Sequence, residues 1–155
     1  MKRSFFAGLA VILGCRPPPG PPTPQAWIGC YSLARGPWDV APEPVFAAMP
    51  GPRLRLTDHE RRKRGDFNDG PRIPTDRPVR QASFGRESAF WWVTDSSTII
   101  VSTGGLAGAA IELGRTRSGL AGSVTGFNDI LKTDSAGHYR LWLSHATLVA
   151  ARAPC

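Results

Sequence analysis

The stretch FWWVTDSSTIIVSTGGLAGAAIEL, residues 90–113, decides the fold. It contains three short runs rich in β-branched and aromatic residues, at 90–94, 98–102 and 109–113. Asp95-Ser96-Ser97 separates the first two runs, and a glycine-rich connection at 103–107 separates the second from the third. Short apolar runs divided by turn residues are typical of neighbouring antiparallel strands. The stretch therefore predicts three consecutive strands of a β-meander.

The same pattern continues on both sides of this stretch. We expect further strands at 27–33, 53–57 and 120–127, and a tail at 139–152 that breaks near Ser144 and His145 into two. Residues 58–78 and 128–138 are predicted loops, and no segment of ten or more residues keeps a helical period. The prediction is an all-β protein: a small antiparallel meander barrel or sandwich of seven or eight strands, in one domain at 27–155.

Alternation along the predicted strands indicates which side chains face the core. Ile99 and Val101 share one face, as do Ala109, Ile111 and Leu113, whereas Glu112 points away. The aromatic strand places Phe90 and Trp92 on one face and Trp91 on the other. Two interpretations remain open for the aromatic residues: they line a ligand cavity, or they are ordinary core. The set is Phe90, Trp91, Trp92 and Trp142.

The N-terminus has the pattern of an export signal. MKRSFFAGLAVILGC joins the basic Lys2 and Arg3 to a short apolar run that ends at Gly14-Cys15. We expect residues 1–14 to be a lipoprotein signal peptide and Cys15 to carry acyl chains such as palmitate. Residues 15–26, RPPPGPPTPQA after the cysteine, predict a proline-rich tether. The expected location is the bacterial outer membrane; a periplasmic or secreted protein and a cytosolic one are the alternatives.

The chain has three cysteines, Cys15, Cys30 and Cys155. If Cys15 carries lipid, an even pair remains. A cysteine at position 155 of an exported domain is most simply explained by a disulfide with Cys30. Two unrelated thiols are the alternative.

The net charge of +7 indicates acidic partners. For an exported chain these are anionic lipid headgroups, polysaccharides or cell-wall polymers, whereas nucleic acid is not expected. The basic run Arg61–Arg64 is a second candidate for polyanion binding. Because several carboxylates flank this run, a solvated loop is the favoured interpretation.

Motifs for catalysis are missing. His138 and His145 are seven residues apart, which does not bring two ligands together on a strand, and Asp129 and Asp134 are typical turn residues. We predict no catalytic residue, no metal ligand and no cofactor. Two function classes remain: a lipid-anchored binding or structural module for an apolar ligand, an envelope polymer or a partner protein, and an envelope enzyme, such as a hydrolase, with a loop-built site.

Four segments resemble a set of small, uncharacterised bacterial envelope proteins. In these a Gly-Cys-Tyr strand followed by Gly-Pro-Trp opens the domain and a cysteine closes it. The segments are WIGCYSLARGPW at 27–38, WWVTDSSTIIVSTGGLAGAAIEL at 91–113, RTRSGLAGSVTGFND at 115–129 and ATLVAARAPC at 146–155. The resemblance implies a compact β domain and the Cys30–Cys155 pair. A weaker similarity is to lipocalin-like barrels, from whose Gly-x-Trp pattern Gly29-Cys30-Tyr31 departs.

Overall fold

The computed structural model describes residues 23–41, 50–61, 73–105, 107–117, 119–133, 136–137 and 139–155. Within residues 129–133 and 139–142 only the backbone is described. The predicted signal peptide, Cys15 and most of the predicted tether therefore lie outside the described residues, as do Asp134, His138 and most of the basic run at 61–64. In the described part of the chain, no helix has the length and hydropathy that a bilayer crossing requires.

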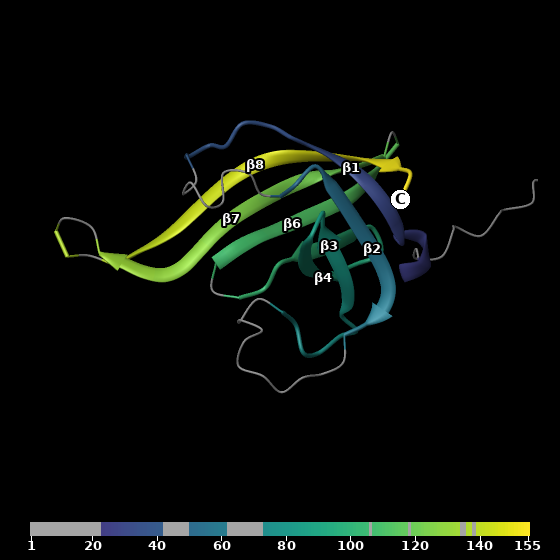
Figure 1. Ribbon diagram of the computed structural model, residues 1–155, viewed down its shortest axis with the longest axis horizontal. Helices are drawn as coiled ribbons and strands as arrows, with labels where there is room; N and C mark the ends of the chain where they lie inside the picture. The colour runs from purple at the N-terminus through teal and green to yellow at the C-terminus, as the bar shows by residue number, and fades with distance from the viewer. Residues whose placement is uncertain are drawn as a thin grey trace, which may run out of the picture.

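Eight antiparallel strands, each paired with the next in the chain, form a closed barrel (Figure 1). A single 3₁₀ turn, η1 (Pro24–Ala26), precedes them. The strands are β1 (Gly29–Arg35), β2 (Arg53–Glu60), β3 (Arg80–Phe84), β4 (Glu87–Val93), β5 (Thr98–Ser102), β6 (Ala107–Thr116), β7 (Gly119–Thr133) and β8 (Tyr139–Ala153). The predicted all-β meander is confirmed as an eight-stranded barrel.

Closure comes from the pairing of the first strand with the last. β1 pairs with β2 on one side and with β8 on the other, with Leu33 opposite Ala150. Because every strand then has two neighbours, the barrel has no free sheet edge along the paired residues.

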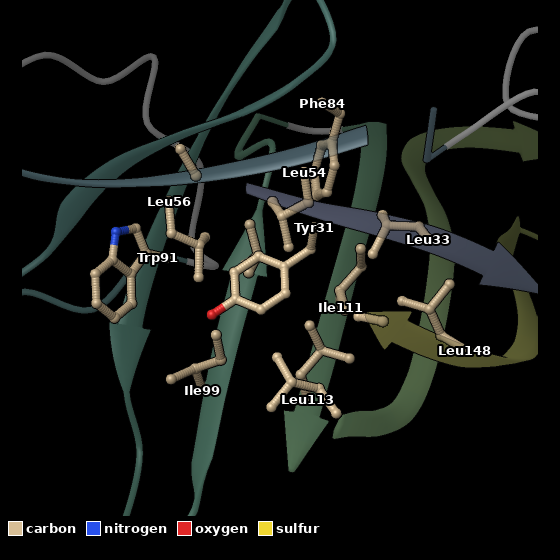
Figure 2. Close-up of a cluster of buried hydrophobic side chains, with 14 of the residues drawn as sticks. Tyr31, Leu33, Leu54, Leu56, Phe84, Trp91, Ile99, Ile111, Leu113 and Leu148 are labelled. Carbon is tan, nitrogen blue, oxygen red and sulfur yellow. The ribbon is translucent and has the colours of Figure 1, made fainter. Parts of the chain in front are cut away.

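The barrel interior follows the alternation of the strands. Ile99, Val101, Ile111 and Leu113 are fully buried, and Glu112 is exposed as predicted. Figure 2 shows inward side chains from β1, β2, β4, β5 and β6 meeting around Tyr31. Burial of such side chains contributes about 1.5–3 kcal/mol each, so this cluster is the main source of stability.

A second, smaller apolar cluster lies on the outside of the barrel. Trp92 points outward from β4 and is only 6% exposed, because Ile73 and Val79 of the segment before β3 cover it. Phe90 and Ile100 pack against this cluster from the sides. The two faces of the aromatic strand are thus both buried, one inside the barrel and one under the 73–79 segment.

Three expectations about the strands were wrong. The tail does not break at Ser144 and His145, because β8 is one continuous strand in which Ser144 points inward and is fully buried. The expected loop at 128–138 is shorter, because β7 continues to Thr133 and pairs with β8 beyond a bulge after Asn128. Strand β3 was not predicted at all.

The last two strands are much longer than the others. β7 and β8 have 15 residues each, against five for β3 and β5. Figure 1 shows them running past the end of β6 as a two-stranded projection.

Candidate functional site

The aromatic residues proposed as a ligand cavity do not share one surface. Trp91 lies inside the barrel, fully buried, and its Nε1 donates to the Thr57 carbonyl at 2.9 Å. Phe90 and Trp92 lie on the outside in the second cluster. Trp142 is in β8 opposite Asn128, and its side chain is outside the described part.

The inward side chains of the described strands form one buried apolar cluster inside the barrel. Its largest fully buried members are Trp27 and Trp91, and they are surrounded by leucine, isoleucine and valine side chains of six strands. Because protein interiors are closely packed, the buried aromatic rings are in contact with other side chains. The two pockets described below are lined in part by members of this core: Tyr31 lines both, and Trp27 and Leu54 line one each.

The cysteine pair is confirmed as a disulfide. Cys30 at the start of β1 bonds Cys155, with an S–S distance of 2.12 Å and a Cα–Cα distance of 5.2 Å. The bond links the residues on either side of the β1–β8 seam, where Cys30 pairs with Ala153.

The first pocket, which we call the outer groove, has a volume of about 520 Å³ and lies over the outer face of β1, β2 and β3. Arg53 and Arg55 point outward from β2 and are exposed, while the alternating Leu54 is 1% exposed and points inward. Hydroxyls of Ser32 and Ser83 add polar groups on the neighbouring strands. Among the described residues no Asp or Glu side chain lines the groove; the lining is Cys30–Ser32, Pro52–Arg55, Ser83, Gly85 and Ala153–Cys155.

The second pocket lies where η1 covers one end of the barrel, which we call the η1 end. Trp27, fully buried, follows η1 and closes this end. The Arg115 guanidinium lies over the Trp27 ring at 4.6 Å, and that of Arg152 over the Tyr31 ring at 4.8 Å. The pocket has about 230 Å³ and is lined by Ala26, Trp27, Tyr31, Arg115, Thr116, Gly119, Leu120, Ala150 and Arg152.

Both arginines of the η1 end are fixed by backbone carbonyls. Arg115 Nη2 and Arg152 Nη2 each donate to the Ala26 carbonyl at 3.0 Å, and Arg152 Nη1 donates to that of Ile28 at 2.6 Å. The Tyr31 hydroxyl donates to the Trp27 carbonyl at 2.6 Å. Burial raises the pKa of Tyr31 above its usual value, and the positive charges of Arg152 and Arg115 partly oppose that rise.

A third arginine at an aromatic ring differs from this pair. Arg80 lies 5.5 Å from the Trp91 ring centroid, and its Nε is 3.3 Å from the Asp58 carboxylate. Its charge is therefore balanced locally, unlike those of Arg115 and Arg152.

His145 was a candidate for the enzyme alternative. Among the described side chains its ring hydrogen-bonds no carboxylate, although Asp39 interacts with it electrostatically. Its Nδ1 lies 3.0 Å from the Thr125 hydroxyl, and its backbone N–H donates to the Asp39 carboxylate at 2.7 Å. That hydrogen bond is the main reason why the pKa of Asp39 lies below its usual value. Asp129 lies in β7, and its side chain is outside the described part. Among the residues that the structure describes, no three His, Cys, Asp or Glu side chains are placed to hold a metal ion.

The pair Arg115 and Arg152 is the feature that sequence analysis missed. Each lies two residues after an inward residue near the end of a strand, Leu113 in β6 and Ala150 in β8, and so continues the inward face. This spacing of two was visible in the sequence, but only closure of the barrel brings the two strand ends to Ala26.

Comparison with known proteins identifies no relative of this chain. No protein-family model, curated protein or solved structure matches the chain.

Proposed function

We propose that this chain is a lipid-anchored β-barrel of the bacterial envelope that binds an anionic envelope polymer at its outer surface. The observation that carries the proposal is the outer groove, which contains Arg53 and Arg55 and no carboxylate side chain. The large buried side chains inside the barrel, among them Trp27 and Trp91, favour binding at the surface over binding of an apolar ligand inside.

The groove suits a polymer because its charges follow a strand. Arg53 and Arg55 are alternate residues of β2, so their backbones are about 7 Å apart on one face. Guanidinium groups bind carboxylates through paired hydrogen bonds, and the hydroxyls of Ser32 and Ser83 can donate to or accept from sugar hydroxyls. A chain of anionic sugars meets both kinds of group in the groove.

The envelope location is supported by the basic and apolar N-terminus and by the disulfide. Disulfides persist in oxidising compartments such as the periplasm. Replacing the acceptor, Cys15→Ser, should release the protein from the membrane fraction or leave it uncleaved. Processing and fractionation like the unmodified protein would contradict the lipid anchor.

Binding to polygalacturonate, a polymer of sugar carboxylates, tests the groove. Arg53→Gln with Arg55→Gln should weaken binding about tenfold or more, since a hydrogen bond to a charged group contributes about 1.5–3 kcal/mol. The matched control is Arg77→Gln with Arg117→Gln, which removes two charges outside the groove lining. Equal affinity of the two double variants would contradict the proposal and leave only a general charge effect.

A further inference from the structure

The η1 end of the barrel brings two positive charges together. The Nη2 atoms of Arg115 and Arg152 each lie 3.0 Å from the Ala26 carbonyl oxygen, so these atoms are at most about 6 Å apart. In the part of the chain that the structure describes, no Asp or Glu forms an ion pair with either side chain. The two charges repel each other, and the neutral carbonyls of Ala26 and Ile28 offset that repulsion only in part.

The hydrogen-bonding capacity of the pair is not used up. Within the described residues Arg115 donates only through Nη2, to the Ala26 carbonyl, so its Nε and Nη1 have no partner there. A guanidinium has five N–H donors in a planar fork, and that fork matches the oxygens of a phosphate. The Trp27 and Tyr31 rings under the two guanidinium groups hold them in place from the other side.

The space beside the pair is large enough for an anion. The pocket of about 230 Å³ exceeds the roughly 30 Å³ that one water occupies in the liquid, so a phosphate group and several waters fit. Arg115 and Arg152 are its only charged lining residues.

We propose that this pocket binds a phosphate group, which Arg115 and Arg152 hold from two sides. A tetrahedral phosphate has enough oxygens to accept from both forks at once, whereas a flat carboxylate pairs best with one. The site shares Tyr31 with the outer groove, but its two arginines are not in the groove lining, and the site does not depend on polymer binding there.

The position of the pocket indicates where the phosphate comes from. Residues 24–26 form η1, which joins the barrel at this end (Figure 1). With the proposed anchor at Cys15, we infer that this end faces the membrane. This assignment of a lipid headgroup as the source rests on the proposed lipid anchor; the phosphate site itself does not.

The site is tested by titrating the full-length protein with inorganic phosphate at constant ionic strength. Binding is measured from the NMR signals of the arginine Nε–H and tryptophan Nε1–H groups. Ala26→Glu is the key variant, because it places a carboxylate at the pocket wall and leaves both arginines in place. Ala26→Gln is its matched uncharged control. We expect saturable shifts in the unmodified protein and in Ala26→Gln, and at least tenfold weaker binding in Ala26→Glu.

A second variant keeps the test independent of small changes at η1. Arg115→Lys with Arg152→Lys retains both charges but removes the planar forks, and should also weaken phosphate binding at least tenfold. Near-ultraviolet circular dichroism checks that each variant is folded. The proposal is overturned if the unmodified protein shows no saturable shift, or if the folded Ala26→Glu variant binds phosphate as the unmodified protein does.

Glycerophosphoglycerol, a lipid headgroup without acyl chains, distinguishes the two sources. Tighter binding of this diester than of inorganic phosphate supports a membrane headgroup, and the reverse supports a free phosphate; both support the site. Because these probes are soluble, a failure of the Cys15→Ser release experiment leaves the result unchanged. The two proposals can therefore fail separately.

Discussion

Removal of the Cys30–Cys155 disulfide should destabilise the barrel strongly. The two cysteines are 125 residues apart, so the bond closes a loop that contains all eight strands. For a loop of this length the chain-entropy relation gives about 5 kcal/mol at 25 °C, and loss of native disulfides typically costs about 2–5 kcal/mol. The double variant Cys30→Ala with Cys155→Ala should therefore unfold at a lower temperature.

The size of the shift follows from the entropy of unfolding. At about 2.1 cal/mol/K per residue over roughly 130 residues, a loss of 2–5 kcal/mol lowers Tm by about 7–18 °C. Thermal unfolding followed by circular dichroism at 218 nm (a wavelength for β structure) measures it. Reductant should lower the Tm of the unmodified protein to that of the double variant and leave the double variant unchanged.

One result would refute this reasoning. If the bond only prevents fraying of the chain end, Tm falls by less than about 4 °C, and amide exchange rises in residues 151–153 alone. The β1–β8 ladder would then hold the seam without the disulfide.

Two further predictions concern backbone contacts. Gly122→Ala should lower the free energy of unfolding by about 1–3 kcal/mol, because a methyl group there overlaps the Glu112 carbonyl. Gly126→Ala on the same strand is the control, because its methyl group meets only ordinary contacts. Denaturant unfolding of both variants measures the difference, and equal midpoints would contradict the prediction. The depressed pKa of Asp39 means that its carboxylate holds the His145 N–H at neutral pH and releases it as the pH falls below the usual value of 3.8. The His145 amide shift should titrate in that range, and Asp39→Asn should abolish the titration.

The sequence predicted the fold well where one face of a strand meets the core. Ile111 and Leu113 alternate with Glu112, Ile99 and Val101 alternate with the outward Ile100, and all four inward residues lie inside the barrel as predicted. β3 was missed because only two of its side chains, Ala82 and Phe84, point inward, and alanine is a weak apolar signal. Arg80 and Gly85 lie on either side of them.

The tail shows a different limit. Ser144 and His145 look like a break in an apolar strand, yet Ser144 keeps the inward position between neighbours that are also small, including Gly126 opposite it. Pairing with β7, and the hydrogen bond from the Asp39 N–H to the His145 carbonyl, hold the strand where the polarity of the side chain does not. The register of a barrel is a property of several strands together, which a single segment does not encode.

The candidate sites were less predictable than the fold. The cysteine pair could be inferred because three cysteines offer few pairings once one carries lipid. The arginines at 115 and 152 gave no such signal, since their meeting point at Ala26 depends on the closure of all eight strands.

The seam between β1 and β8 also determines when the protein can fold. During synthesis β1 is made before β8. The edge of β1 that pairs with β8 therefore has no partner until residues 148–153 have been made. Until then the growing sheet has an open edge, which invites pairing with other chains. Contacts this distant in sequence form slowly, on the millisecond to second scale. A chain released whole and kept apart from its copies will therefore refold in higher yield than one folded during synthesis at high concentration.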